Sequence, residues 1–411
     1  MKILIIHQYF LEQNGAGGSR FNQFVKYWTE AGHKITIVAG TVDYATGKKE
    51  ERYKGKWIVS NEIGNNAVVF RCFVSENYNK NFLGRFLAYY SFVISSFWAI
   101  LFCIGGQDIV IATSPPLFVA IPAYLAKIIK KAPLIFEIRD LWPKFAIDAG
   151  VIKNKLIIKF SYGLENFIYR KADLINVLTP SFQEYLIGEK NISENKIIYI
   201  PNGGDLDIMK PGAKDNWVRK KFDWNNKFIV LYVGAHGQAN DLWQIINVAK
   251  LLKDRRDILF VLVGDGMEKP KIKEIAQKGK LNNIQFLDPV PKNEIADFIN
   301  ASDVCVAILQ PIFTTTYPNK IFDYMACAKP IILPIDGVCR KLIIDEAGAG
   351  IFAKPRDAQD FKEKILYFYD RPEEAREMGL RGLDFVENNF DRKKLAIKYL
   401  NIIENSTKIK L

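Results

Sequence analysis

The chain contains few of the residues that build disulfide frames or metal clusters. Its 411 residues include five cysteines, which are scattered and form no Cys-x-x-Cys pair, and three histidines. An odd and dispersed set of cysteines argues for a reducing compartment and against a disulfide frame or a zinc site. Three histidines are also too few for a histidine metal cluster. The composition therefore favours a cytoplasmic protein.

Several nucleotide-binding and targeting signals are missing as well. No Walker A motif occurs, which disfavours a P-loop ATPase. The first expected βαβ unit lacks a strict Gly-x-Gly-x-x-Gly and an acidic residue at the end of its second strand, which weakens an NAD-binding interpretation. The apolar run at residues 3–6 is too short for a signal peptide. The chain has no long block of like charge, so a nucleic-acid-binding tail is not expected.

What is present is the composition of a globular protein with more than one domain. Hydrophobic residues make up 49% of the chain and charged residues 25%. A chain of this length is expected to form two or three domains. The net charge of +12 suits an anionic partner, such as nucleic acid, anionic lipid or a nucleotide substrate, or it reflects a generally lysine-rich composition.

Strand and helix patterns alternate along the chain in two series. The first fills residues 1–205 and closes at the turn Pro201-Asn202-Gly203-Gly204, a natural joint between domains. The second fills residues 206–392, and a last helix covers about 393–411. These series predict an α/β fold of two doubly wound domains facing a cleft, with one large sheet as the alternative. The polar residues 41–65 are predicted to form a loop.

One apolar segment raises the question of a membrane. Residues 86–104 contain no charged side chain and are long enough to span a bilayer. They also contain three serines, and a strand pattern follows almost at once. We therefore expect a helix that packs on a sheet or dips into a membrane face rather than a true span.

The segment from Pro318 to Leu333 has the pattern of a loop that feeds a short helix and then a buried strand. A helix start offers free N–H groups to a phosphate. Lys320 lies in the first turn, where a cation is unfavourable unless an anion binds nearby, and Asp323 lies one turn later. The alternative is an ordinary helix with a surface lysine.

Three glycine turns lie where strands feed helices, at Gly17-Gly18, Gly234–Gly237 and Gly264–Gly266. Each allows a close backbone approach to a ligand, and together they indicate a nucleotide-diphosphate ligand. Asp205-Leu206-Asp207 has the Asp-x-Asp pattern of a metal site, but turn and cap chemistry is the favoured interpretation.

A set of motifs in a fixed order resembles glycosyltransferase family 4 over essentially the whole chain. The motifs are Gly17-Gly18, Pro201-Asn202-Gly203-Gly204-Asp205, Gly264-Asp265-Gly266-Met267-Glu268 and Asp323-Tyr-Met-Ala-Cys-Ala-Lys-Pro. Glu137-Ile-Arg-Asp-Leu-Trp-Pro is similar to the WbuB-type fucosamine transferase branch of bacterial O-antigen and capsule assembly. The resemblance implies a GT-B fold of two Rossmann-like domains, the N-terminal one binding the acceptor and the C-terminal one the donor. The last helix would pack on the N-terminal domain. It also implies retaining transfer from a nucleotide-diphosphate sugar without a metal or other cofactor.

The resemblance carries roles over to individual residues. Asp323 would hold the ribose, and the amides of Asn319 and Lys320 would grip the diphosphate. The donor-binding set that it implies is Gly17, Gly18, Gly234, His236, Gly264, Asp265, Gly266, Val290, Asn319, Lys320 and Asp323.

The chain departs from the family pattern where cations and a carboxylate are expected. Ala235 and Asn240 replace the diphosphate-binding arginine and lysine, and Thr315 replaces the first glutamate of the Glu-x7-Glu motif. Lys320 is therefore the main candidate for stabilising the leaving group. Arg139 stands where the family commonly has a histidine touching the donor sugar. The candidate catalytic residues are Lys320, Arg139 and Asp323. Arg139 could instead form a structural pair with Asp140 or Glu137.

The expected function is transfer of a sugar to an undecaprenyl-diphosphate-linked saccharide at the inner membrane face. A UDP-sugar is the favoured donor, such as an N-acetylated deoxyhexosamine. Residues 86–104 with Lys127, Lys130 and Lys131 would face the membrane, and no nucleic-acid partner is expected. The alternatives are a nucleotide-sugar 2-epimerase of the same fold, an NAD-dependent dehydrogenase or a non-enzymatic basic binding protein.

Overall fold

The computed structural model describes residues 1–12, 20–43, 47–77 and 82–408. The described chain forms two compact units. Unit 1 contains residues 1–12, 20–201 and 393–408, and unit 2 contains residues 202–392. Each unit is built on one sheet with helices on both faces, so the prediction of two doubly wound α/β domains is confirmed.

The sheet of unit 1 has eight strands in the order β3-β4-β2-β1-β5-β6-β7-β8. All neighbours pair in parallel except β3, which runs antiparallel to β4. The central strands are almost continuous apolar runs because helices cover both faces. The strands are β1 (Lys2–Ile6), β2 (Lys34–Gly40), β3 (Ile58–Ile63), β4 (Ala67–Cys72), β5 (Ile109–Ser114), β6 (Leu134–Ile138), β7 (Leu174–Val177) and β8 (Ile197–Tyr199).

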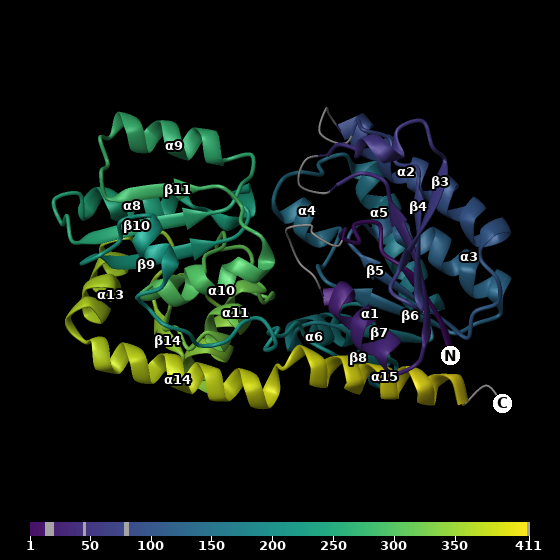
Figure 1. Cartoon of the computed structure of the whole chain (residues 1–411). Coiled ribbons are helices and arrows are strands. Elements are labelled where there is room, and N and C mark those ends of the chain that lie inside the picture. The colour runs from purple at the N-terminus through teal and green to yellow at the C-terminus, as the bar shows by residue number, and fades with distance from the viewer. Residues whose placement is uncertain (13–19, 44–46, 78–81, 409–411) are drawn as a thin grey trace. The chain divides into compact units, whose positions relative to one another are not determined.

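Two helical layers enclose this sheet (Figure 1). One apolar core lies between the sheet and α2, α3, α5 and α6, and the other lies beneath α1 and α15. In the second core the Trp28 indole donates to Ala396 O at 2.9 Å and packs against the Tyr399 ring. The helices are α1 (Arg20–Glu30), η1 (Glu51–Tyr53), α2 (Phe82–Trp98), η2 (Ala99–Cys103), η3 (Leu117–Val119), α3 (Ala120–Lys130), α4 (Lys144–Asp148), α5 (Lys155–Lys171), α6 (Pro180–Gly188), η4 (Glu194–Lys196) and α15 (Arg392–Lys408).

The prediction of a loop over residues 41–65 was wrong for its second half. This stretch contains η1 and the edge strand β3, which pairs along its length with β4. The polar residues of β3 are those expected of an edge strand with one face toward water, and they give this stretch the composition of a loop.

The apolar residues 86–104 lie in α2 and in η2, a π-helical turn that continues it. Within the described residues one helical segment, Phe86–Cys103, is long and apolar enough to cross a membrane by length and composition, and 39% of it is buried. Phe92, Ser95 and Ser96 face the core of unit 1, so one side of the segment is packed against the sheet.

Unit 2 is built on a parallel six-stranded sheet in the order β11-β10-β9-β12-β13-β14. Its strands are β9 (Phe228–Val233), β10 (Ile258–Val263), β11 (Ile284–Leu287), β12 (Val304–Val306), β13 (Ile331–Leu333) and β14 (Gly350–Phe352). The core on one face includes α10, α11 and α14, and the core on the other includes α8, α9 and α13 (Figure 1). The helices are α7 (Trp217–Lys221), η5 (Gln238–Asn240), α8 (Trp243–Leu251), α9 (Lys269–Lys278), α10 (Lys292–Ala301), α11 (Lys320–Ala326), α12 (Val338–Arg340), η6 (Lys341–Glu346), α13 (Ala358–Asp370) and α14 (Pro372–Asn389).

Candidate functional site

Two glycine turns interlock at the carboxyl edge of the unit 2 sheet. The parallel strands β9 and β10 end side by side, so the turns that follow them are neighbours. A Cβ on Gly264 would lie 2.0 Å from Gly234 O, and one on Gly266 would lie 2.6 Å from His236 O. Both glycines also have positive φ values, of 145° and 155°. The turns therefore need these glycines to pack on each other, whether or not a ligand is present.

Lys320 lies over the first of these turns. Its Nζ is 3.7 Å from the centre of the Tyr232 ring and donates to Asn240 Oδ1 at 3.3 Å. A Cβ on Gly234 would lie only 2.9 Å from the same Nζ. Glycine at position 234 thus leaves room for the lysine. Tyr232 is held in turn by its hydroxyl, which donates to Ala235 O at 2.8 Å.

The ammonium of Lys320 has no acidic partner within 4 Å among the described residues. Burial lowers the pKa of Lys320 well below its ordinary value of 10.5. The backbone N–H groups of Asn319 and Lys320 also donate to no acceptor in the part of the chain that the structure describes. An anion placed here would restore the lysine charge and accept from two amides. The arrangement is chemically suited to an oxyanion.

Asp323 faces different groups although it belongs to the same short helix. Burial raises the pKa of Asp323 to about 6, and the charges of Arg392 and Lys292 oppose that rise. Asp205 is also nearby and pairs with Lys292 and with Arg392 Nη1, the latter at 3.2 Å. The Asp-x-Asp motif thus supplies a buried ion-pair partner. Among the described residues no group of three or more His, Cys, Asp or Glu is placed to hold a metal ion.

His236 and Asp265 belong to the same two turns, and Val290 lies between β11 and α10. The His236 side chain is fully buried, and burial, aided by the Lys269 and Lys320 charges, lowers its pKa to about 4. Asp265 is exposed, and its carboxylate accepts from Gly266 N. Val290 is partly buried against the core of unit 2. In this conformation the imidazole is buried within the turns and is not accessible to a ligand.

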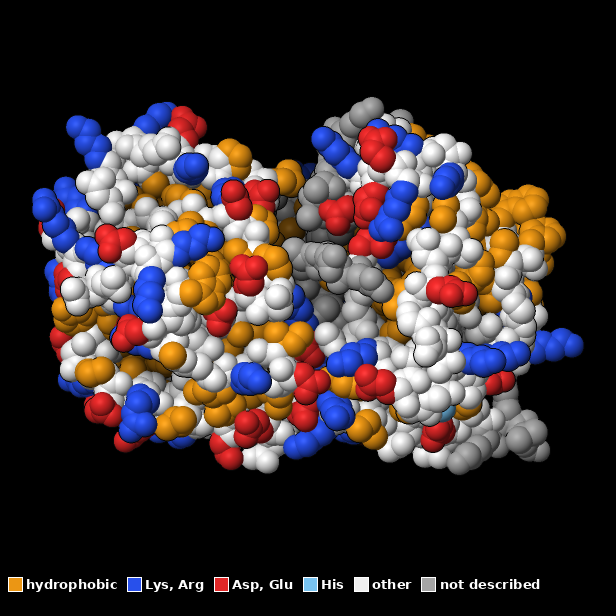
Figure 2. Space-filling view, viewed as in Figure 1, with side chains coloured by type: hydrophobic (Ala, Val, Ile, Leu, Met, Phe, Trp, Pro, Cys, Tyr) orange, Lys and Arg blue, Asp and Glu red, His pale blue; other side chains and the backbone are white. Residues whose placement is uncertain are grey.

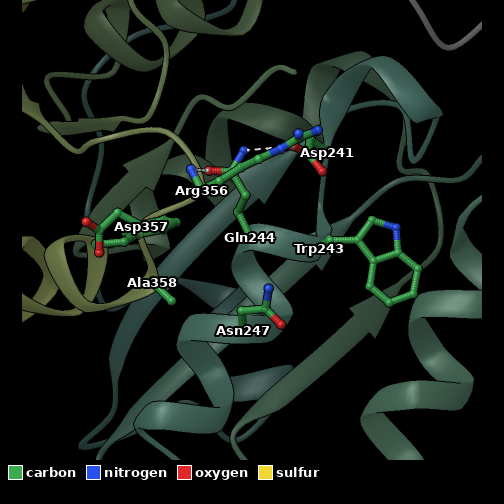
Figure 3. Close-up of a pocket in the computed structure, with 8 residues that line it drawn as sticks. Asp241, Trp243, Gln244, Asn247, Arg356, Asp357 and Ala358 are labelled. Atoms are coloured by element: carbon green, nitrogen blue, oxygen red, sulfur yellow. Dashed lines mark hydrogen bonds and ion pairs between the residues drawn. The ribbon is translucent and has the colours of Figure 1, made fainter. Parts of the chain in front are cut away.

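Asp241, the residue that follows Asn240, lines a small pocket (Figure 3). Asp241 follows Asn240 with a φ of 42°, and its Oδ2 accepts from Arg356 Nε at 2.9 Å and from Gln244 Nε2 at 3.1 Å. The Arg356 backbone N–H donates to Gln244 Oε1 at 2.7 Å. This closed set of bonds fixes the turn that presents Asn240 to Lys320.

In unit 1 the structure places Arg139 against His7. Arg139 follows β6 and His7 follows β1, and their side chains meet through Arg139 Nη1 and His7 Nε2 at 3.0 Å. The structural-pair alternative is not seen within the described residues, because Glu137 is bonded to Arg20, at 3.3 Å, and Arg139 makes no ion pair with Asp140. Burial raises the pKa of Asp140 to about 6, and the Arg139 charge opposes the rise.

The structure therefore gathers most of the expected donor residues of unit 2 around Lys320. Asp323 belongs to a separate group of charges, and Arg139 belongs to unit 1. Gly17 and Gly18 lie outside the described residues. The residues that the sequence did not reveal are Tyr232, Lys292, Arg392 and His7. None of these four stands in a local pattern that distinguishes it, because each contacts a partner far away in the chain.

Two family models match the chain in succession. The model described as Glycosyltransferase Family 4 matches residues 18–208, and the model described as Glycosyl transferases group 1 matches residues 214–383. A protein named as a colanic acid biosynthesis glycosyl transferase, WcaI of Escherichia coli K12, is 25% identical over 398 residues, which are 93% of this chain and 97% of that protein. The N,N'-diacetylbacillosaminyl-diphospho-undecaprenol alpha-1,3-N-acetylgalactosaminyltransferase of Campylobacter jejuni is 25% identical over 57% of this chain and 61% of its own length.

Solved structures resemble the chain over nearly its full length. Sucrose-phosphate synthase from Thermosynechococcus elongatus has a TM-score of 0.76 at 17% identity and covers 99% of both chains. Anabaena HepE, solved in complex with UDP and glucose, has a TM-score of 0.70 at 16% identity, over 98% of this chain and all of its own. At such identities the likeness establishes the fold alone.

Proposed function

Because this chain belongs to glycosyltransferase family 4 and has the GT-B fold, we propose that it is a retaining enzyme that transfers a sugar from a UDP-sugar to a lipid-linked saccharide. That it is a glycosyltransferase of polysaccharide or glycoconjugate synthesis follows from the two family matches and the relatives. The donor, the stereochemistry and the acceptor are the proposal. An N-acetylated deoxyhexosamine is the donor sugar that we favour, in O-antigen or capsule assembly.

The observation that carries the proposal is Lys320, which has no acidic counter-charge within 4 Å among the described residues and lies beside two free backbone amides. The donor diphosphate would bind there and charge the lysine. As the bond to the sugar breaks, negative charge grows on the β-phosphate, and a positioned cation in a water-poor site lowers the barrier for that step. In the proposed mechanism the same phosphate accepts the proton of the acceptor hydroxyl, and no metal is required.

The remaining donor contacts are assigned within unit 2. Asp323 would accept hydrogen bonds from the ribose hydroxyls, since a carboxylate can accept two at once. Val290, at the end of the loop after β11, would lie beside the base. Gly234, Gly264, Gly266, Asp265 and His236 would shape the turn that faces the phosphates, with the buried imidazole acting through the turn backbone.

Names of related proteins support the choice of substrates. The Campylobacter relative is named for action on a diphospho-undecaprenol-linked saccharide, and the HepE structure contains UDP. We extend both features to this chain as part of the proposal. The donor would then be a UDP-sugar, and the acceptor an undecaprenyl-diphosphate-linked saccharide.

An apolar surface of unit 1 supports a place at the inner face of the membrane. Figure 2 shows apolar side chains gathered at the right-hand edge of this unit. On α2 and η2 a stripe is exposed that includes Phe86, Tyr90, Ile94, Trp98 and Phe102. Aromatic contacts join Phe86 to Phe118 and Phe118 to Phe160 of α5, so the two helices share one surface.

Basic residues flank that surface. On α5, Leu156 is 78% exposed and Phe160 54% exposed, and Lys155 and Lys159 are exposed beside them. Apolar side chains edged by lysines are typical of a protein that lies on an anionic bilayer. We propose that unit 1 docks on the membrane through these helices, which would bring the enzyme to its lipid-linked acceptor.

The proposal is tested by radiolabel transfer. Purified enzyme is incubated with a panel of UDP-sugars and GDP-sugars and with undecaprenyl-diphosphate-linked saccharides, and lipid-extractable label is counted. Transfer from a UDP-sugar with retained anomeric configuration is expected, without added divalent metal and in the presence of a chelator. Sugar isomerisation without any acceptor would refute the transferase reaction. Transfer from a GDP-sugar alone would refute UDP as the nucleotide of the donor.

A further inference from the structure

The contact between His7 and Arg139 requires a neutral imidazole. The Arg139 guanidinium can only donate hydrogen bonds, so His7 Nε2 must accept at the observed 3.0 Å and must be unprotonated. The proton of the neutral ring then lies on Nδ1. That atom is buried and has no hydrogen-bond partner.

The surroundings of His7 favour this neutral form. The side chain is 3% exposed, and its ring lies 6.1 Å from the Phe10 ring and 5.6 Å from the Phe21 ring. The charged groups that act on it are Arg139, at the end of β6, and Arg71, on β4. Burial first, and then these two positive charges, lower the pKa of His7 well below 6.5. The imidazole therefore stays an acceptor across the physiological range.

The hydrogen-bond partner of the Arg139 side chain distinguishes this residue from Arg20, a structural arginine of the same unit. Arg20 is 4% exposed, and its charge is balanced by Glu137, a fully buried carboxylate. Arg139 is only partly buried, and in the described chain His7 is the single hydrogen-bond partner of its guanidinium. Its positive charge is thus oriented by a neutral group, and its other N–H donors are left for a ligand. A guanidinium in this condition is suited to a phosphate or carboxylate oxygen.

We propose that His7 is a positioning residue that holds the Arg139 guanidinium ready to receive a phosphate oxygen of a substrate. Arg139 touches the substrate and His7 acts through it. The inference rests on the proposed function, because the sugar donor and the lipid-linked acceptor both carry a diphosphate. Which of the two phosphates is bound is decided by which Michaelis constant responds.

The test compares two substitutions of His7. His7→Gln keeps an oxygen that can accept from the guanidinium, whereas His7→Met keeps a similar size without an acceptor for it. A lost hydrogen bond to a charged group corresponds to a loss of roughly tenfold or more, so we expect His7→Met to lower kcat/KM by about that factor and His7→Gln to recover most of it. Arg139→Gln removes the group that touches the substrate and should lower kcat/KM at least as much as His7→Met does. His33→Gln, at the other described histidine of unit 1, serves as control and should leave the rate unchanged.

The loss of kcat/KM in His7→Met should come from a higher KM for one substrate and not for the other. A rise in KM for the nucleotide sugar assigns the donor diphosphate to Arg139, and a rise in KM for the lipid-linked acceptor assigns the acceptor diphosphate. Equal losses in His7→Met and His7→Gln, with both proteins folded by circular dichroism, would overturn the positioning role.

A measurement on the resting protein separates this inference from the proposed reaction. Nitrogen NMR of the 15N-labelled histidine ring should show an unprotonated Nε2 and a protonated Nδ1 from about pH 5.5 to 8. The resonances should shift in Arg139→Gln. Titration of His7 near its ordinary value would refute the pair even if sugar transfer is observed. The predicted spectrum with no transfer from any sugar nucleotide would refute the proposed function instead.

Discussion

Each unit places a cation where parallel strands of its sheet end, and each holds that cation with a neutral partner. In unit 2 the holder of Lys320 is the Asn240 amide with the Tyr232 ring, and in unit 1 the holder of Arg139 is the His7 imidazole. A neutral holder fixes the cation without consuming its charge. Both cations are therefore oriented for a negatively charged ligand, which is bound where strands of α/β sheets end.

Buried arginines elsewhere in both units are treated differently. Arg20 pairs with Glu137 in unit 1, and Arg219 pairs with Asp303 at 2.8 Å in unit 2. Both arginines also donate to backbone carbonyls, so they join segments of the fold. The comparison teaches that the partner of a cation, rather than its burial alone, separates a structural role from a ligand-binding one.

The largest effect is expected from removing Lys320, the cation of unit 2. Lys320→Ala is expected to lower kcat by about 10²–10³-fold, because charge on the leaving group would lose its stabilising cation. Asn240→Ala removes only a neutral holder and should cost a few-fold. Steady-state rates with the best donor measure both, after thermal melting has shown that the proteins are folded. Equal and small effects would contradict the role given to Lys320.

The units also differ in what their surfaces offer a membrane. Trp98→Ser with Phe102→Ser removes two exposed aromatics of unit 1 and should weaken binding to phosphatidylglycerol-containing vesicles by about 10–100-fold. Met267→Ser in unit 2, at a residue that is 78% exposed, is the matched control and should bind as the wild type does. Co-sedimentation measures the partition. An equal loss of vesicle binding in both proteins would contradict docking through the apolar surface of unit 1.

Two glycine substitutions in unit 2 test whether the reaction rate depends on the position of the Lys320 ammonium. Gly234→Ala would set a Cβ 2.9 Å from Lys320 Nζ at a φ of 143°, so we expect a roughly tenfold fall in kcat from the displaced ammonium. Gly237→Ala has open space and a φ of −100° and should be nearly neutral. Rates and melting temperatures are compared for both. A drop in stability with an unchanged rate for Gly234→Ala would separate the turn from the chemistry.

Asp323 should show the smallest effect, and the size of the effect depends on pH. Its pKa is raised to about 6 in the fold from 3.8, so the folded protein binds the proton more tightly and loses stability as pH rises through this window. Asp323→Asn should therefore stabilise the free enzyme by on the order of 1–2 kcal/mol at pH 8. The gain should shrink toward pH 4. Denaturant melts at several pH values measure it, and a less stable variant at pH 8 would contradict the assignment.

The same substitution separates stability from donor binding. Loss of the carboxylate should raise KM for the nucleotide sugar several-fold, because an amide accepts hydrogen bonds from ribose less well than a carboxylate does. A stabilised enzyme with weaker donor binding is the expected combination. In the wild type, KM for the donor should likewise rise as pH falls below about 6.

Much of the fold followed from local pattern. Apolar runs bounded by glycine turns predicted the alternating series of strands and helices, and the last helix, expected at about 393–411, is confirmed by α15. The edge strand β3 was not predicted because its polar residues, two of which are exposed, give it the composition of a loop. The short helices α4, α6 and α7 have too few turns to show a clear period.

The candidate site was only partly predictable for a different reason. Lys320 stood out because a cation in a first helical turn conflicts with the helix dipole, which is a local rule. His7 is 132 residues from Arg139, and Tyr232 is 88 residues from Lys320. No periodicity connects such residues, since the order of strands in the sheet sets their distance.

The sequence by itself determined the class of the fold, the two series of elements and the unusual lysine, because these depend on hydrophobic period and on charges within one helix. Tertiary structure alone decided the partners of the two cations. It set a tyrosine ring and an amide beside Lys320 and a neutral imidazole beside Arg139, where a carboxylate would have consumed the charge. The physical reason is that a parallel sheet brings the ends of strands from distant parts of the chain to one edge.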